Sequence, residues 1–259
     1  MDGQGDKGLR VLISAAGGGA GRVIARDFHR AGHRVLACDV TADGLEALAG
    51  DCPGLLTQVA DAGSEADVAA LFERMDDALG GIDVLVNNVG ISGPTAAVED
   101  ITLDAWDETL RVNLTGHFLA CRAAAPRMKA QGSGLIVNIS SGSAKLGLPM
   151  RTPYVVTKGA ILSLTLNLAR ELGPFGIRVN AILPGAIRGP RLERIIAEKA
   201  AALGADPEAF SRQVLRYVSM RTMVEPEDIA ATLLFLASPG GARITGQMLG
   251  VDGNVEWEE

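Results

Sequence analysis

Residues 9–39, LRVLISAAGGGAGRVIARDFHRAGHRVLACD, decide the fold class of this chain. The stretch opens with the apolar run 9–15, continues through the glycine-rich segment 17–21 and an amphipathic segment ending near Arg30, and closes with a second apolar run, 33–39. Short apolar runs that alternate with amphipathic segments are typical of βαβ units in a parallel sheet. We therefore predict a strand, a glycine-rich turn, a helix and a second strand in this order.

The same stretch predicts a dinucleotide-binding site. Glycines allow the backbone to approach a pyrophosphate, the amino end of the following helix stabilises its negative charge, and an acid that ends the second strand accepts hydrogen bonds from the adenosine ribose. Asp39 provides that acid. Its carboxylate would repel a 2′-phosphate, and no basic residue lies at positions 14–20 or 40–41. The sequence therefore favours NAD over NADP as the cofactor.

The alternation continues through the rest of the chain without an internal linker. It predicts a single-domain α/β Rossmann fold over residues 1–259, with a doubly wound, mostly parallel sheet of seven strands. Residues 188–217 do not fit the alternation, and we interpret them as a helical lid over the substrate. The further strands are predicted at 55–60, 82–86, 134–140, 177–182 and 249–253, and the further helices at 63–79, 102–128, 154–172 and from Glu225 onward.

A tyrosine and a lysine are placed to act together in the predicted helix 154–172. Tyr154 and Lys158 are four residues apart, which puts the phenol and the ammonium side by side on one helical face. A fixed cation beside a phenol favours the phenolate and makes the tyrosine a candidate proton acceptor and donor. Ser141 follows the apolar run 134–140, so its hydroxyl is expected at the carboxyl end of a strand, where ligands bind in parallel sheets. Taken alone, the Tyr–Lys pair is also typical of a solvated helix face.

Composition argues against several other classes of protein. With 47% hydrophobic residues and 32 glycines, the chain can bury a large core without disulfides. A net charge of −7 disfavours nucleic acid as a partner, because phosphate binding requires a basic surface. The three cysteines lack metal-ligand spacing, so we expect reduced thiols and no metal. The polar segment 1–8 and the lack of a long apolar window indicate a cytoplasmic protein without a membrane segment.

Nearly the whole chain resembles the classical short-chain dehydrogenase/reductase family. Each motif of that family is weak evidence by itself, but here the motifs occur together, in the family's order and with its spacing. They are the glycine-rich loop, Asp39, Asp61, the Asn-Asn-Val-Gly tetrapeptide at 87–90, Asn113, Ser141, Tyr154, Lys158 and the Pro-Gly pair at 184–185.

The resemblance implies a catalytic tetrad of Asn113, Ser141, Tyr154 and Lys158. Tyr154 would exchange a proton with the substrate oxygen, which Ser141 would hold by a hydrogen bond. Lys158 would stabilise the phenolate and bind the ribose next to the nicotinamide. Asn113 would bend its helix and hold, through its backbone, a water that links Lys158 to solvent.

The resemblance also implies a set of cofactor-binding residues in addition to Asp39. Ser14, Gly19, Ala20 and Gly21 would form the pyrophosphate loop, Asp61 and Ala62 would flank the adenine, Asn88 and Gly90 would line the ribose, and Pro184, Gly185 and Ile187, together with Tyr154 and Lys158, would surround the nicotinamide nucleoside.

Two positions depart from the family pattern. The family loop usually begins Thr-Gly, whereas this chain has Ser14-Ala15. Serine keeps the hydroxyl, but Ala15 would cost about 1 kcal/mol or more if its φ were positive. Where the family often has a threonine near the nicotinamide carboxamide, this chain has Gly189, so that contact would come from the backbone or be missing.

The activity that the resemblance implies is NAD-dependent interconversion of a secondary alcohol and a ketone, with Tyr154 as general acid and base. Sugars, sugar acids and hydroxy acids are the candidate substrates. One alternative is a reductase of 3-oxoacyl thioesters on acyl carrier protein. An alternative of another class is a non-catalytic NAD(H)-binding sensor or scaffold. The family further implies a homotetramer that is joined through the segments 102–128 and 154–172.

Several arginines bear on the substrate hypothesis. Cations near the site could pair with a carboxylate of the substrate. The same residues could instead be solvated or contact another subunit, which is the slightly favoured interpretation. They are Arg151, Arg188, Arg191 and Arg194.

Overall fold

Seven parallel strands form one sheet in the computed structural model, which describes residues 8–202, 204 and 206–255. The strands are β1 (Arg10–Ser14), β2 (Arg34–Asp39), β3 (Leu56–Val59), β4 (Val84–Asn87), β5 (Gly134–Ile139), β6 (Ile177–Pro184) and β7 (Met248–Val251). Their order across the sheet is β3-β2-β1-β4-β5-β6-β7, and every neighbouring pair is parallel. The chain starts in the middle, moves to one edge, and returns to build the other half. This order confirms the predicted doubly wound Rossmann sheet.

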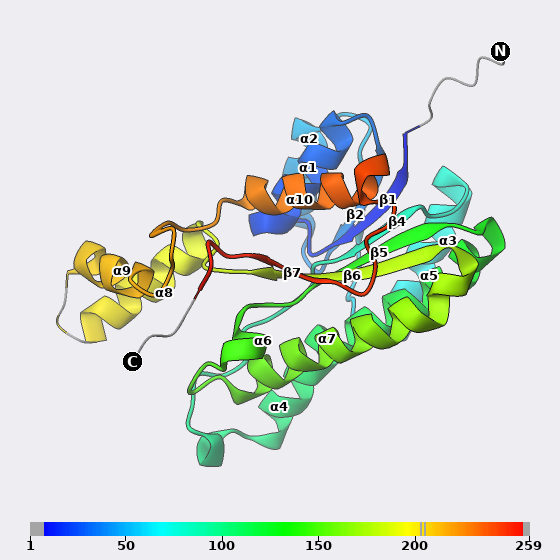
Figure 1. Cartoon of the computed structure of the whole chain (residues 1–259). Coiled ribbons are helices and arrows are strands. Elements are labelled where there is room, and N and C mark those ends of the chain that lie inside the picture. The colour runs from blue at the N-terminus through cyan, green and yellow to red at the C-terminus, as the bar shows by residue number, and fades with distance from the viewer. Residues whose placement is uncertain (1–7, 203, 205, 256–259) are drawn as a thin grey trace.

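Helices cover both faces of the sheet (Figure 1). One face carries α1 (Gly19–Arg30), α2 (Ala42–Asp51) and α10 (Pro226–Ala237), and the other carries α3 (Glu65–Leu79), α5 (Gly116–Gln131) and α7 (Thr152–Leu172). The remaining described α-helices are α4 (Leu103–Leu110), α6 (Ser143–Leu146), α8 (Pro190–Ala202) and α9 (Pro207–Leu215).

The core lies in two layers because the inner strands are buried on both faces, whereas the edge strands β3 and β7 are partly exposed. In β1, Val11 and Ile13 pack with α1 and α10, whereas Leu12 between them packs with α3 and α5. Phe28 of α1 and Phe72 of α3 are among the largest fully buried side chains, one in each layer. Continuous apolar runs are expected for parallel strands that are covered on both sides, which is why the sequence pattern located them well.

The predicted continuous helix at 102–128 was wrong in one respect. The chain forms α4, then a π-helical turn at Arg111–Thr115, and only then α5. The π-helical turn contains Asn113, whose side chain bonds to the backbone of Ile91 in the segment after β4. The short helix α2 between β2 and β3 was also not predicted.

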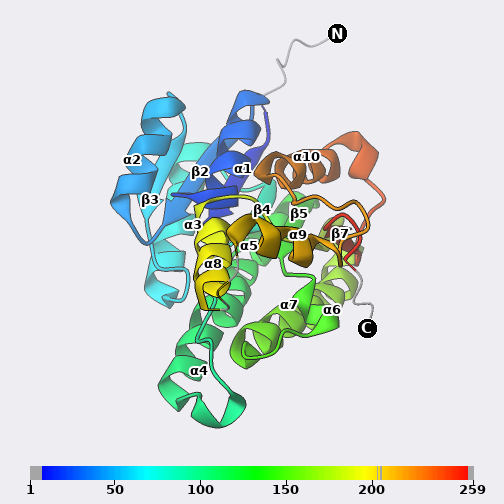
Figure 2. The same ribbon diagram turned by 90° about the vertical axis from the view of Figure 1, so that its left-hand side faces the viewer.

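The carboxyl ends of the strands meet at the edge of the sheet where α8 and α9 project (Figure 1). Figure 2 views the molecule from this edge, with α8 and α9 in front of the strands. β6 leads to them through a segment in which Ile187 forms an isolated parallel bridge with Val224. Within the described residues, no helix combines the length and the apolar character that crossing a membrane requires.

Candidate functional site

The amino end of α1 is open and carries no capping side chain. Its N-cap residue is Gly18, and the first turn contains no acidic residue. A Cβ atom built on Gly18 or Gly19 would meet no atom within 4 Å. Ala20 lies in the first turn of the helix. Unpaired N–H groups at such an end favour an anion, so the loop fits the pyrophosphate that the sequence predicted.

Close contacts with Ala15 and Asn88 fix the shape of the glycine-rich loop. A Cβ atom on Gly21 would lie 2.0 Å from the carbonyl oxygen of Ala15 and 2.6 Å from Nδ2 of Asn88, so only glycine fits there. Asn88 donates from Nδ2 to the carbonyl oxygens of Ser14 and Ala15, at 3.2 and 3.1 Å. Ala15 has a φ of +52°, the conformation that the sequence analysis identified as costly for alanine. Asn88 therefore braces the loop directly.

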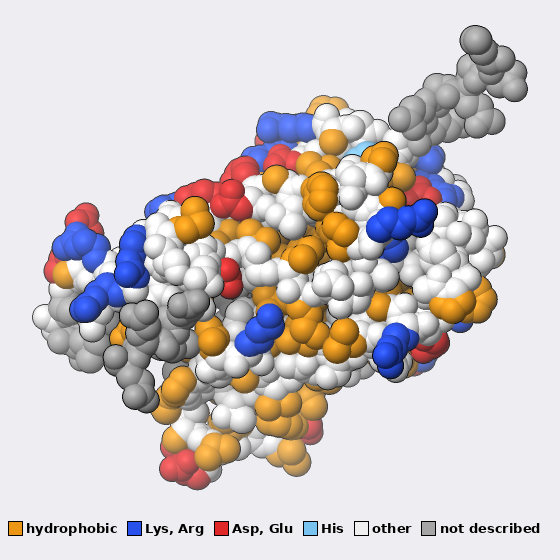
Figure 3. All heavy atoms as spheres, in the orientation of Figure 1, with side chains coloured by type: hydrophobic (Ala, Val, Ile, Leu, Met, Phe, Trp, Pro, Cys, Tyr) orange, Lys and Arg blue, Asp and Glu red, His pale blue; other side chains and the backbone are white. Residues whose placement is uncertain are grey.

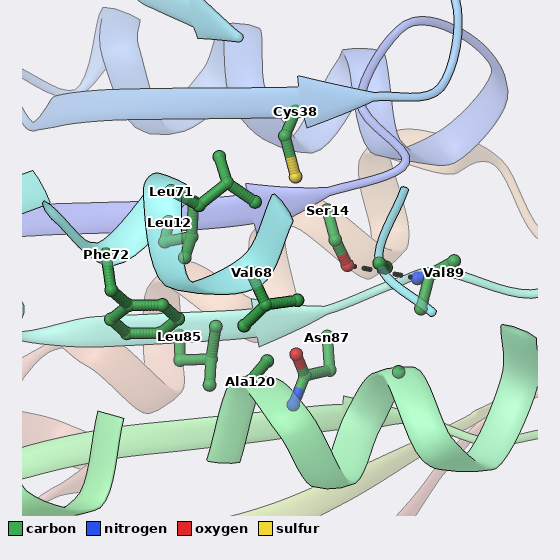
Figure 4. Close-up of a pocket in the computed structure, with 12 residues that line it drawn as sticks. Leu12, Ser14, Cys38, Val68, Leu71, Phe72, Leu85, Asn87, Val89 and Ala120 are labelled. Carbon is green, nitrogen blue, oxygen red and sulfur yellow. Dashed lines mark hydrogen bonds between the residues drawn. The ribbon is translucent and has the colours of Figure 1, made fainter. Parts of the chain in front are cut away.

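The hydroxyl of Ser14 ties β1 to the segment after β4. Its Oγ accepts hydrogen bonds from the backbone N–H groups of Asn88 and Val89, at 3.0 and 3.2 Å; the second is drawn in Figure 4. Ser14 is 6% exposed. The hydroxyl that serine shares with the family's threonine thus holds two strand ends together.

Asp39 lies at the end of β2, next to the glycine-rich loop. Its Oδ2 accepts a hydrogen bond from the N–H of Gly17 at 2.9 Å, and its Oδ1 accepts bonds from the backbone and hydroxyl of Thr41. Arg22 pairs instead with Asp51 at 2.7 Å. The acid expected to meet the adenosine ribose is thus held by neutral donors, Gly17 of the loop and Thr41 after β2.

A small pocket lies beneath these strand ends (Figure 4). Its lining is mostly apolar, and Figure 4 shows Ser14, Cys38 and Asn87 as its polar members. Burial raises the pKa of the Cys38 thiol to about 12, so the thiol stays protonated. The pocket does not contain the predicted reactive groups. Leu12, Val68, Leu71, Phe72, Leu85 and Ala120 supply most of the apolar surface.

Asp61, at the end of β3, has both carboxylate oxygens engaged. Oδ1 accepts from the N–H of Gly63 at 2.8 Å, and Oδ2 accepts from Nη1 of Arg111 at 2.7 Å. Sequence reasoning missed Arg111, which lies 50 positions away. Ala62 is covered by Gly116 at the start of α5, where a Cβ atom would lie 3.0 Å from the Ala62 carbonyl oxygen. The predicted adenine-flanking pair is therefore packed against the π-helical segment and α5.

α7 carries Tyr154 and Lys158 one turn apart, as predicted. Lys158 is 4% exposed, and its ammonium donates to the carbonyl oxygen of Ile139 at 2.7 Å. The same ammonium lies 5.8 Å from the centroid of the Tyr154 ring. Gly90 borders it, because a Cβ atom there would lie 3.2 Å from Nζ. Because Lys158 is buried, the Tyr–Lys pair does not lie on a solvated helix face.

Ser141 lies two residues beyond the end of β5. Its Oγ accepts hydrogen bonds from the N–H and the hydroxyl of Ser143, at 3.2 and 2.9 Å. Sequence reasoning missed Ser143, although the two-residue spacing is typical of local serine hydrogen bonds. Because Ser141 accepts both of these bonds, its own hydroxyl hydrogen can be donated to another acceptor.

The Pro-Gly pair at 184–185 adjoins the Ser141 segment. Gly142 donates from its N–H to the carbonyl oxygen of Pro184 at 3.2 Å. A Cβ atom on Gly185 would lie 2.9 Å from the Cα of Asp252. Ile187 follows in the bridge to Val224. The predicted nicotinamide-side residues thus lie at one strand end, beside the neighbouring strand that leads to Ser141.

Asn113 joins three segments of the site from inside the π-helical turn. Fully buried, it accepts from the N–H of Ile91 at 2.7 Å and donates to the carbonyl oxygen of Ile91 at 2.9 Å. It also donates to Oγ1 of Thr157 at 3.2 Å. The predicted distortion of its helix is this π-helical turn, a feature that is frequent at functional sites. Its link to Lys158 through a water stays a prediction.

His117 is a further buried group beside this cluster, and sequence reasoning missed it. It lies one turn after Asn113 on α5 and is 0% exposed. Burial, with repulsion from the Lys158 ammonium, lowers its pKa to about 3. The four-residue spacing from Asn113 in a helix was the available signal.

Two of the arginines of the substrate hypothesis, Arg151 and Arg188, have separate partners in the structure. Nε of Arg188 donates to Glu225 at 2.7 Å, so its charge is balanced at the start of α10. Nη1 of Arg151 donates to Oγ1 of Thr95 at 2.6 Å, next to the start of α7. Arg194 is exposed. The side chain of Arg191 lies outside those that the structure describes.

Comparisons with known proteins agree with this fold. The family model described as "Enoyl-(Acyl carrier protein) reductase" matches residues 15–255. A Rhizobium meliloti protein named "Probable galactose dehydrogenase GalD" is 38% identical over 95% of this chain and 94% of its own length. A Thermotoga maritima "3-oxoacyl-[acyl-carrier-protein] reductase FabG" is 32% identical over 96% and 98%. The crystal structure of an "NAD+-Bound Xylitol Dehydrogenase" superposes with a TM-score of 0.88 at 31% identity, covering 94% of this chain and 97% of that one.

Proposed function

This chain belongs to the short-chain dehydrogenase/reductase family, and we propose that it is an NAD-dependent oxidoreductase that interconverts a secondary alcohol and a ketone. The observation that carries the proposal is the buried Lys158. Its ammonium is fixed by the Ile139 carbonyl and lies 5.8 Å from the Tyr154 ring centroid. A buried cation beside a phenol has a chemical use, because it favours the phenolate that a proton acceptor requires.

Each residue of the site has a defined part in the proposed reaction. Tyr154 takes the hydroxyl proton from an alcohol substrate at its phenolic oxygen, or returns a proton to the oxygen of a ketone. Ser141 donates a hydrogen bond to the same substrate oxygen, with its own lone pairs occupied by Ser143. Lys158 stabilises the phenolate, and Asn113 holds the segment after β4 against α7. When bound, the nicotinamide cofactor supplies the hydride chemistry.

NAD is the proposed cofactor. The open amino end of α1 and the glycines above it suit a pyrophosphate, and Asp39 suits the adenosine ribose. A 2′-phosphate would meet the Asp39 carboxylate, whose hydrogen-bond partners Gly17 and Thr41 are uncharged. The similar xylitol dehydrogenase was crystallised with NAD+ bound, which supports the same choice here.

A sugar or polyol is the substrate class that we propose first. Two of the similar proteins are named for galactose and for xylitol. Arg151, held by Thr95 near the start of α7, could add recognition of a sugar acid or hydroxy acid. The segment 188–217, with α8 and α9, is proposed as the lid over this substrate.

Initial rates test this proposal directly. The purified chain is assayed with NAD at mildly alkaline pH on sugars, polyols, sugar acids, hydroxy acids and aryl alcohols, with NADP in parallel. Tyr154→Phe should lower kcat by about 10²-fold or more, as expected for loss of a general acid and base, while NADH binding measured by fluorescence persists. NADH binding without turnover of any substrate would favour the sensor or scaffold alternative.

A second candidate function is reduction of 3-oxoacyl thioesters. The FabG relative and the description of the matching family model favour it. Asp39 counts against it, because a reductase that uses NADPH must accommodate the 2′-phosphate. A 3-oxoacyl thioester assayed with NADPH and NADH separates the two functions, since a clear preference for this substrate with NADPH would contradict the first proposal.

We also propose a cytoplasmic homotetramer. Figure 3 shows hydrophobic side chains gathered on the face between α10 and α7, and Phe235 of α10 is 50% exposed. On the helices of the other layer, Phe118 and Leu166 are 47% and 46% exposed. Large exposed apolar side chains support contacts between subunits. Light scattering of the purified chain tests the assembly.

A further inference from the structure

His117 is a buried polar group whose hydrogen-bonding capacity is not fully met by the described part of the chain. It is fully buried, and neither Nδ1 nor Nε2 has a well-aligned hydrogen bond, although the backbone carbonyls of Asn87 and Asn113 lie close to the ring. A buried donor or acceptor without a partner is unfavourable, and buried polar groups in native proteins are nearly always bonded to protein or water. A neutral ring can donate to only one of these carbonyls, so its other nitrogen still needs a partner that donates.

The surroundings of the ring define what that partner can be. The backbone carbonyls of Asn87 and Asn113 lie beside it, and the Lys158 ammonium is near enough to repel a charged ring. Lys158 acts on the ring from α7 and the backbone of Asn87 from β4. Cys121, one turn further along α5, is a buried thiol that stays protonated. The neutral imidazole has one N–H for a carbonyl and one nitrogen that can only accept.

We propose that His117 holds a buried water between its accepting nitrogen and the Lys158 ammonium, and so acts as a positioning residue for Lys158. The water would accept from the ammonium and donate to the imidazole and to the Asn113 carbonyl. Three polar partners are what a buried water typically has. The family resemblance implies a water on the backbone of Asn113. That His117 also binds this water is inferred from the buried ring in this chain.

The consequence for the reaction rests on the proposed function. Lys158 keeps its place near Tyr154 through the Ile139 carbonyl on one side and through this water on the other. With the water lost, the ammonium would be less well fixed and the phenolate less stabilised. The acid limb of the pH profile of kcat for alcohol oxidation would then move to higher pH.

The state of the ring can be measured without turnover. The chain has only three histidines, so ¹⁵N spectra of the labelled full-length protein, with His117→Gln to assign the signal, report on it directly. We expect a neutral ring in a single tautomer from pH 5 to 8. A crystal structure should show one water in contact with His117 and Lys158. A ring that gains a proton in this range, or a dry ring, would overturn the proposal whether or not the enzyme is active.

Kinetics of matched variants test the positioning role. His117→Leu should lower kcat about tenfold and raise the acid-limb pKa by about one unit with little change in KM for NAD. His117→Gln, which keeps an acceptor for the water, should stay within about threefold of the parent. Cys121→Ala, one turn further along α5, controls for loosened packing and should leave the acid limb unmoved. Equal losses in the Leu and Gln variants without a shift of the acid limb would reduce His117 to a packing role.

Failure of this inference can be told from failure of the proposed function. A parent protein that oxidises no alcohol contradicts the function, yet the spectra and the crystal structure still decide whether His117 holds the water. An active parent whose His117→Leu variant keeps the parental pH profile contradicts the positioning role alone. If the Leu variant does not fold, the Gln variant and the spectra of the parent still decide.

Discussion

The carboxylate of Asp39 accepts a hydrogen bond from the backbone N–H of Gly17 at 2.9 Å. One acid at the end of β2 thus restrains the glycine-rich loop and stands where the adenosine ribose is expected. Replacing Asp39 would therefore affect both the cofactor preference and the shape of the loop, because it removes the negative charge together with the carboxylate acceptor of the Gly17 N–H.

Asp39→Ser should shift the cofactor preference toward NADP. The substitution removes the charge that repels a 2′-phosphate and leaves a hydroxyl near Gly17. We expect the ratio of kcat/KM with NADP to that with NAD to rise by about 10²-fold, an energy of about 2.7 kcal/mol. Asp39→Glu, which keeps the charge, is the control and should leave the preference for NAD. An unchanged ratio in the serine variant would mean that the carboxylate does not select the cofactor.

Ala15→Gly should stabilise the protein. Ala15 has a φ of +52°, where a Cβ atom costs about 1 kcal/mol and glycine costs little. We expect a gain of up to about 1 kcal/mol in the free energy of unfolding, reduced by the greater freedom of glycine in the unfolded chain. Urea unfolding measures it. The neighbouring Ala16→Gly, at a fully buried residue without positive φ, should destabilise; equal losses for both variants would contradict the strain at Ala15.

Two glycines of the same loop should respond differently to alanine. At Gly21 the new Cβ atom would lie 2.0 Å from the Ala15 carbonyl oxygen, so Gly21→Ala should lower the melting temperature even without cofactor. At Gly18 the Cβ atom would meet no atom of the chain within 4 Å, so Gly18→Ala should fold normally and weaken NAD binding if the pyrophosphate lies there. Melting curves with and without NAD compare the two. A Gly18→Ala variant with parental NAD affinity would remove the pyrophosphate from that position.

Local sequence patterns predicted the sheet because the inner strands are runs of mostly apolar residues buried on both faces. They also predicted that Ser141 follows the carboxyl end of a strand, and it lies two residues beyond β5. The family resemblance implied a bend at Asn113, but the local hydrophobic pattern did not predict the π-helical turn that separates α4 from α5. The Asn113 amide bonds to Ile91, 22 positions away, and the helical period is compatible with an unbroken helix there.

The same limit applies to other parts of the site. Arg111 reaches Asp61 across 50 positions, and Arg188 reaches Glu225 across 37. No local pattern encodes these pairings, because they depend on how the elements pack. Ser143 is different, since its bond to Ser141 spans two residues and was open to prediction.

The burial of His117 should appear in the pH dependence of stability. Its pKa is lowered to about 3 in the folded protein, against about 6.5 for an exposed histidine. Between these values the unfolded chain binds the proton and the folded chain does not. The free energy of unfolding therefore falls as the pH falls from about 6.5, by up to about 1.4 kcal/mol per pH unit.

His117→Leu removes this contribution and no other titrating group. Urea unfolding of parent and variant at pH 4 to 8 gives the difference in their stabilities, from which the carboxylates common to both cancel. Poorer packing of leucine adds a constant offset, so the slope is the informative quantity. The difference should be flat above pH 7.5 and should move in favour of the variant as the pH drops toward 4. A constant difference over the whole range would mean that the folded and unfolded chains protonate His117 alike, which is incompatible with a neutral buried ring.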